Sequence, residues 1–116
     1  MWHGCEDTSV TKILKNGFQR EASRCGRQVH GRGTNFARSA TMALWYATQK
    51  QRGSTRTLLL CTVVVGTVGT CDAEKNAAPL KDGSLPMTMV SPNKDILVTY
   101  KDNHARVEFI VVVGGA

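Results

Sequence analysis

The segment Thr57–Val65 places the strongest constraint on the fold of this chain. It is a nearly continuous apolar run rich in β-branched residues, which predicts a buried central strand. Gly66 and Gly69 follow it and predict a bulge or kink where the chain continues. Two later runs, Ile96–Tyr100 and Val107–Val113, predict further strands. The second half of the chain is therefore expected to build most of a sheet.

The first half predicts two helices and short strand segments. Asp7 or Thr8 can cap a helix with a helical apolar spacing, which Asn16-Gly17 ends. Ser39 can cap a second helix with one face formed by Ala40, Ala43, Leu44 and Ala47. The end of a strand is expected at 1–4, a short strand or turn at 31–37, a turn at 51–54, and loops at 19–30, 71–94 and 101–106. The sum is an α+β domain.

Length and charge narrow the class of protein. The 116 residues, 41% of them hydrophobic, predict one domain over 1–116. A net charge of +6 favours anionic partners such as nucleic acid or a phosphate-bearing cofactor. The basic residues are spread out, so they form a solvated face or, from Arg20 to Arg38, flank a diphosphate. A small nucleic-acid-binding domain is an alternative, although only 6% of residues are aromatic.

The cysteine spacing and the first residues of the chain indicate where in the cell the protein is located and whether it binds a metal. The start is too polar for a signal peptide, and no apolar run reaches the roughly 18 residues of a membrane span. The four cysteines lack metal-ligand spacing, so we expect no metal. Two disulfides are possible, but free thiols in an intracellular protein, cytoplasmic or nuclear, are the preferred interpretation. The cysteines are Cys5, Cys25, Cys61 and Cys71.

Three side chains suit the chemistry of an N-glycosidic bond. His3 precedes a glycine that lets a ligand approach the backbone, although a lone histidine is more often structural. Tyr46 can stack on a flat ring or belong to the core. Glu108 interrupts an apolar strand, where it is expected to share a face with Ile110 and Val112; it is either functional or an exposed edge residue. A carboxylate can stabilise the oxocarbenium-like ribose that such cleavage produces.

Five motifs in chain order carry a family resemblance. The chain resembles the catalytic domain of the poly(ADP-ribose) polymerase family, the diphtheria-toxin-like ADP-ribosyltransferases, from residue 2 to about 113. The last motif resembles the ending of the mono-ADP-ribosylating members. The motifs are Trp2-His3-Gly4, Ile13-Leu14-Lys15-Asn16-Gly17-Phe18, Gly31-Arg32-Gly33-Thr34-Asn35-Phe36-Ala37, the strand from Leu59 to Gly66, and Asp102-Asn103-His104-Ala105-Arg106-Val107-Glu108-Phe109-Ile110.

The resemblance implies an NAD site and a role for each matching residue. His3 matches the histidine that holds the adenosine-side ribose, and Glu108 the glutamate on the nicotinamide ribose. Gly4 matches the glycine that pairs with the carboxamide, and Tyr46 the stacking tyrosine. Residues 19–30 match the donor loop, and residues 71–94 the acceptor region. The implied catalytic residues are His3, Glu108 and Asn35; the implied NAD-binding residues are His3, Gly4, Cys5, Gly33, Asn35, Phe36, Ala43 and Tyr46.

The chain also departs from the family pattern. Asn35 replaces a tyrosine and Ala43 a serine, which removes a stack and a hydrogen bond of about 0.5–1.5 kcal/mol each and weakens NAD binding about ten- to a hundredfold. The resemblance implies two packed, antiparallel-rich sheets with short helices, truncated at the N-terminus, and a sheet edge open to a homo-oligomer. The expected function is mono-ADP-ribosyl transfer from NAD to a protein or nucleic acid. The alternative is a degenerate member that binds NAD, ADP-ribose or a partner without turnover.

Overall fold

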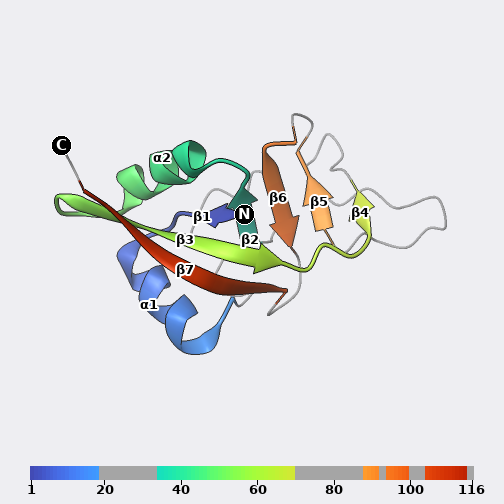
Figure 1. Ribbon diagram of the computed structural model, residues 1–116, viewed down its shortest axis with the longest axis horizontal. Coiled ribbons are helices and arrows are strands. Elements are labelled where there is room, and N and C mark those ends of the chain that lie inside the picture. Colours follow the sequence, from blue (N-terminus) through green and yellow to red (C-terminus); the bar gives the residue numbers. More distant parts are fainter. Residues whose placement is uncertain (19–33, 70–87, 92–93, 100–103, 115–116) are drawn as a thin grey trace.

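Seven strands and two helices make up the part of the chain that the structure, a computed structural model, describes (Figure 1). This part comprises residues 1–18, 34–69, 88–91, 94–99 and 104–114. In chain order the elements are β1 (Trp2–His3), α1 (Asp7–Asn16), β2 (Thr34–Ala37), α2 (Ala40–Lys50), β3 (Thr55–Val63), β4 (Val68–Gly69), β5 (Thr88–Val90), β6 (Ile96–Thr99) and β7 (Ala105–Gly114).

The short strand β1 joins all the strands into one sheet. The strand order is β4-β5-β6-β2-β1-β3-β7, and every pair is antiparallel except the parallel pair β4–β5. Trp2 lies opposite both Ala37 of β2 and Leu60 of β3. The α+β class is thus confirmed, whereas the expectation of two packed sheets is wrong, because β1 bonds to a strand on each side.

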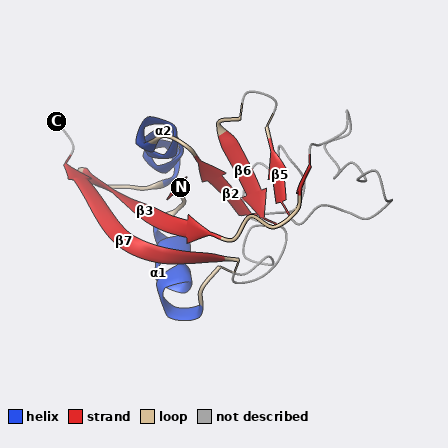
Figure 2. Ribbon diagram, turned by 45° about the vertical axis from the view of Figure 1, so that its right-hand side comes forward, coloured by secondary structure: helices blue, strands red, loops and turns tan. Residues whose placement is uncertain are grey.

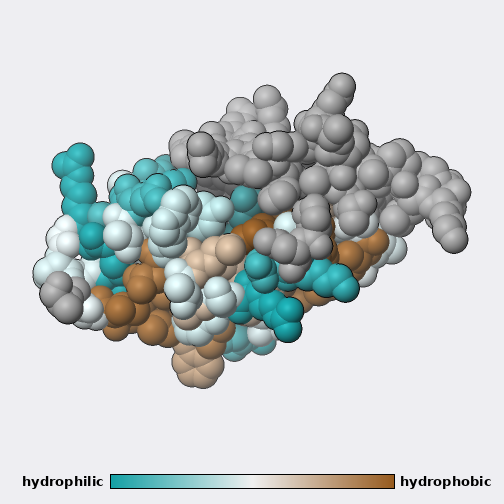
Figure 3. Space-filling view, turned by 90° about the horizontal axis from the view of Figure 1, so that it is seen from above, coloured by the Kyte–Doolittle hydropathy of each residue, from teal (hydrophilic) through white to brown (hydrophobic). Residues whose placement is uncertain are grey.

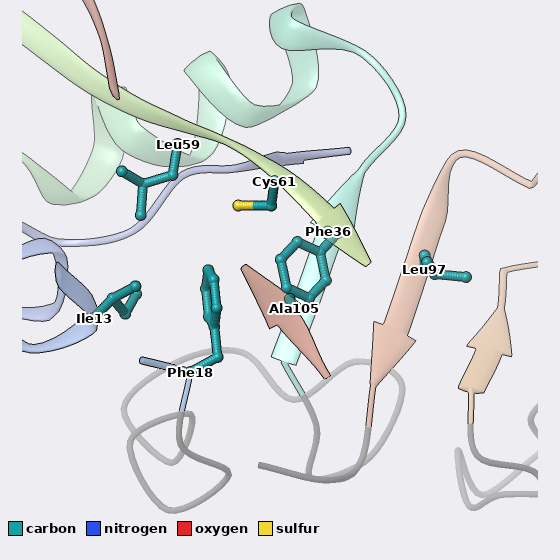
Figure 4. Packing of buried hydrophobic residues seen from close by; sticks show 7 residues of the cluster. All are labelled: Ile13, Phe18, Phe36, Leu59, Cys61, Leu97 and Ala105. Atoms are coloured by element: carbon teal, nitrogen blue, oxygen red, sulfur yellow. The ribbon is translucent and has the colours of Figure 1, made fainter. Parts of the chain in front are cut away.

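The two helices cover opposite faces of this sheet (Figures 1 and 2). We call the face packed against α1 the first face; its side chains point toward one another in Figure 4. The face packed against α2 is the second face. The first face buries Ile13, Phe18, Phe36, Leu59, Cys61, Leu97 and Ala105, and the second buries Ala37, Ala43, Ala47, Leu58, Met89, Ile96 and Val98. Successive strand residues alternate between the two clusters, as the pleat requires.

Several strand expectations need correction. The apolar run that starts at Thr57 does form β3, but β3 lies next to the edge strand β7 and is not central. Its last predicted residues, Val64 and Val65, lie beyond the strand and are exposed. β5 falls inside the expected loop at 71–94, because its three residues gain their structure from pairing with β6 rather than from a periodic pattern. β7 starts at Ala105, two residues earlier than expected.

The helix ends follow local chemistry. The Ser39 hydroxyl accepts a hydrogen bond from Met42 N at 3.2 Å, which confirms it as the cap of α2. Gly17, with φ 76°, ends α1 as predicted. The start of α1 is different: the N-cap is Glu6, without a side-chain cap bond, and Asp7 is already helical.

Gln51 ties the end of α2 to the strands beside the site. Its side chain is buried, with Nε2 donating to the carbonyl oxygens of Cys5 and Thr57, both at 2.8 Å. Oε1 accepts from Thr57 N at 2.8 Å. The chain then turns through Gly53, with φ 94°, into β3. These three bonds fix the segment after β1 relative to α2.

Other expectations fall outside the described residues. They are the loop at 19–30, most of the segment 71–94, and Gly33, Cys25 and Cys71. The two cysteines that the structure does describe, Cys5 and Cys61, are free thiols, and burial raises the pKa of each to about 12. Among the described helices, none has the length and apolar character needed to cross a membrane.

Candidate functional site

His3 lies at the end of β1, packed on the first face. Its ring centroid is 5.2 Å from that of Phe18 and 5.4 Å from that of Phe36. Its Nδ1 is 2.8 Å from the backbone oxygen of Asn35. Burial lowers the pKa of His3, so the imidazole is neutral at pH 7. Because a carbonyl oxygen only accepts, Nδ1 carries the proton and Nε2 keeps a lone pair that can accept from a hydroxyl.

Asn35 connects the two faces of the sheet. Its backbone oxygen meets His3, while its side chain points to the second face, since it lies opposite Val98 of that cluster. Within the part of the chain that the structure describes, the buried amide oxygen Oδ1 has no hydrogen-bond partner. A buried acceptor of this kind is costly unless something donates to it. The side chain therefore suits a polar ligand rather than the apolar core.

Gly4 lets the chain after β1 touch α2. A Cβ on Gly4 would overlap the carbonyl oxygen of Ala43 and come within 3.3 Å of Ala47 N. Ala43 is buried in the second cluster. Tyr46, three residues further along α2, lies on the same side of the helix, and its ring packs edge-on against Trp45 with centroids 5.1 Å apart. The structure thus brings Gly4 against the backbone of Ala43, with Tyr46 three residues further along the same helix.

Glu108 is held as a carboxylate by two neighbours. Its Oε1 accepts from Arg106 Nη2 at 2.7 Å, Arg106 Nε at 2.9 Å and the Thr62 hydroxyl at 3.0 Å. The bonds from Arg106, and then that from Thr62, lower the pKa of Glu108. The side chain remains one-third exposed. It is therefore ionised at neutral pH and reachable by a ligand.

A β-bulge decides the face on which Glu108 lies. The register of β3 and β7 shifts between Leu60, opposite Phe109, and Cys61, opposite Val107. Val107 packs on the first face, yet Val111, four residues on, packs on the second. The expectation that Glu108 shares a face with Ile110 and Val112 is therefore wrong. The bond to Thr62 puts the carboxylate on the second face, while Ile110 and Val112 face the other way.

Most of the site residues that were predicted from the sequence lie on the second face or contact it. It carries the Asn35 side chain, the contact of Gly4 with α2, and Glu108. Glu108 lies on β7, two strand spacings or about 10 Å from β1. His3 contributes from the first face, and its Nδ1 bond ties it to the backbone of Asn35. The structure thus places the carboxylate and the amide on the second face, and the neutral imidazole on the first face, where it packs against Phe18 and Phe36.

Two further residues that the resemblance assigns to NAD binding, Phe36 and Cys5, pack in or against the first cluster. Phe36 is fully buried in the first cluster, and Cys5 packs against that cluster while its carbonyl accepts from Gln51. Ligand groups for a metal do not cluster anywhere in the described ranges. The sequence reasoning missed Arg106 and Thr62 as partners of Glu108. The Arg-x-Glu spacing within a strand was the available signal, because residues two apart share a face.

A comparison with protein families shows the family to which the chain belongs. A model of the poly(ADP-ribose) polymerase catalytic domain matches residues 1–114. The match spans nearly the whole chain, so the chain belongs to this family, and the predicted resemblance to the family is confirmed. Among curated proteins, none matches the chain. Family membership implies NAD-dependent ADP-ribosyltransferase activity, with NAD as the substrate.

Proposed function

We propose that this chain transfers a single ADP-ribose unit from NAD to a protein or nucleic-acid acceptor. In this reaction the bond between the nicotinamide nitrogen and ribose C1 breaks, and nicotinamide leaves with the electron pair. A nucleophilic atom of the acceptor forms the new bond to C1 and loses a proton. The positive charge that develops on the ribose is stabilised by a nearby carboxylate.

The ionised Glu108 on the second face carries this proposal. Arg106 and Thr62 hold the carboxylate by Oε1 alone, which leaves Oε2 to meet one ribose hydroxyl. One free oxygen serves one bound ribose, which favours single transfer over chain elongation. The remaining roles in this proposal rest on the family resemblance, which assigns the other ribose to His3, the carboxamide to the Gly4 backbone and the nicotinamide ring to Tyr46.

The net charge of +6 favours acceptors that carry negative charge, such as acidic proteins or nucleic acids. We also propose an intracellular location, cytoplasmic or nuclear, because free cysteine thiols are typical of reducing compartments.

The test uses NAD labelled in its ADP-ribose part. The purified protein is incubated with it alone, with an acidic protein, and with single-stranded nucleic acid. We expect one nicotinamide released for each label transferred, and adducts of one unit by mass spectrometry. Adducts of several units would contradict single transfer while leaving ADP-ribosyl transfer intact. Release of nicotinamide without an adduct would show hydrolysis instead.

A second candidate is NAD binding without turnover. Asn35 offers no aromatic ring, and the buried Ala43 offers no hydroxyl, so two contacts with nicotinamide are missing. Calorimetric binding of NAD with no nicotinamide release would favour this candidate. Asn35→Tyr then discriminates: a restored stack of about 0.5–1.5 kcal/mol tightens NAD binding roughly two- to tenfold. Turnover gained in Asn35→Tyr would show that the site is intact but weakened by this residue.

A further inference from the structure

We propose that two copies of this chain form a reversible dimer by pairing their β7 strands antiparallel about Val111. One sheet would then run through both copies. The proposal rests on the exposed edge of β7 and is independent of whether the NAD site is active.

The edge strand β7 exposes a run of apolar side chains. It pairs only with β3 among the described strands, and it is ten residues long. Phe109, Ile110 and Val112 are 64%, 53% and 62% exposed. Apolar surface gathers along one side of the molecule in Figure 3. A long apolar edge strand is a template for pairing with another strand.

The hydrogen bonds of β3 show which backbone groups of β7 face outward. Thr57, opposite Val112, bonds through its N–H and C=O to Gln51. Cys61 bonds in the same way to Met1, on the β1 side. Since bonding alternates along an antiparallel strand, Leu58 and Leu60 are the residues that bond to β7. The N–H and C=O groups of Ile110 and Val112 therefore point away from β3, toward the open edge.

A twofold axis at Val111 makes this edge complementary to itself. Ile110 of one copy then lies opposite Val112 of the other, so that their outward N–H and C=O groups pair. Both side chains lie on the same face and cover each other, and Phe109 meets Val113 on the other face. The five residues centred on Val111, from Phe109 to Val113, carry no charge, so the pairs among them bury no charge.

The size of this contact predicts a weak dimer. A standard stable interface buries about 800 Å² on each partner, which the five paired residues from Phe109 to Val113 do not reach. The dissociation constant is therefore expected on the order of tens of micromolar. Because each copy carries a net charge of +6, added salt should screen repulsion and strengthen the dimer. Association driven by opposite charges would weaken with salt instead.

Sedimentation velocity from low to high micromolar concentration tests the proposal. The parent chain should shift from monomer to dimer, more readily at high salt. Val112→Pro removes an outward N–H but no bond to β3, and proline is tolerated on edge strands, so this variant should stay monomeric. Val112→Lys should do the same by placing a charge at the contact. Val64→Lys, a similarly exposed valine off this edge, is the control and should dimerise normally.

A parent chain that is monomeric throughout would overturn the proposal. So would a dimer that persists in both Val112 variants with circular dichroism like the parent's. Loss of the dimer in Val64→Lys as well would move the contact away from β7 and overturn it too. If Val112→Pro fails to fold, Val112→Lys decides the result alone.

Discussion

At the scale of single residues, the chemistry of this chain depends on side chains whose neighbours set their charge. Glu108 takes three hydrogen bonds on one oxygen, and the half-buried His3 has one nitrogen bonded to a carbonyl. The two effects have different consequences: Glu108 stays ionised over a wider pH range, and His3 stays neutral. The site thus presents a negative group and a neutral acceptor, which suits a substrate that develops positive charge.

Arg106→Gln tests the control of Glu108. The bonds from Arg106 are the largest cause of its lowered pKa, so their loss should raise that pKa toward the ordinary value of 4.5. The proposed reaction needs Glu108 in its ionised form, and the acid limb of the transfer rate should therefore move to higher pH. Arg52→Gln, an exposed arginine in the turn before β3, should leave the pH profile unchanged. An unmoved acid limb in Arg106→Gln would show that Glu108 does not set it.

Gly4→Ala tests the close approach of β1 to α2. The added Cβ would overlap the carbonyl oxygen of Ala43, which is backbone and cannot rotate away. We expect a loss of about 1–3 kcal/mol in the free energy of unfolding, measured by urea denaturation. The control is Gly114→Ala, where nothing lies within 4 Å of the new Cβ. Equal stability of the two variants would contradict the contact described here.

At the scale of elements, local signals located the helices and strands but not their partners. Ser39, Gly17 and the apolar run of β3 act through their own sequence neighbours, so their positions were predictable. The bulge beside Glu108 depends on how β7 is registered against β3, which neither strand specifies alone. The face predicted for Glu108 from the sequence was therefore wrong, although Glu108 itself was identified as a candidate site residue. β5 was missed for the same reason.

Among the contacts between elements, the hydrogen bonds of the Gln51 side chain are expected to contribute most clearly to the stability of the fold. Gln51→Leu removes three hydrogen bonds and leaves groups of Cys5 and Thr57 unpaired. We expect a loss of about 2–4 kcal/mol in the free energy of unfolding, because unpaired buried groups cost about 1–3 kcal/mol each and nearby groups partly relax. Gln49→Leu on the exposed side of α2 should change stability by less than about 0.5 kcal/mol. Thermal and urea unfolding provide the comparison.

At the scale of the whole molecule, β1 unites the fold. Two residues of strand, together with the bonds of Met1 to Cys61, join the β3–β7 pair to the other strands. The same strand carries His3, so stability of the sheet and the state of the site are linked. Sequence motifs predicted the family and the α+β class, but not one continuous sheet, since that depends on a strand only two residues long.

The neutral His3 makes global stability depend on pH. Its folded pKa lies below the value of 6.5 expected when unfolded, so the unfolded chain binds a proton first as pH falls. Stability is fully present above pH 6.5 and should decline as pH falls below it. His3→Phe, which fills the same space between Phe18 and Phe36, should give a flatter dependence of the melting temperature between pH 7.5 and 5.5. Parallel curves for the two proteins would contradict a neutral histidine packed between Phe18 and Phe36.

The central claim is that Glu108 on the second face drives the release of nicotinamide from NAD. The direct measurement is the rate of nicotinamide release at saturating NAD for the parent, Glu108→Gln and Glu6→Gln. Removing the charge of Glu108 should lower the rate about a hundredfold or more, in the range found for one stabilising group at a developing charge. Glu6→Gln, the same change at the start of α1, should keep the parent rate. A Glu108→Gln variant that releases nicotinamide at the parent rate would contradict the account.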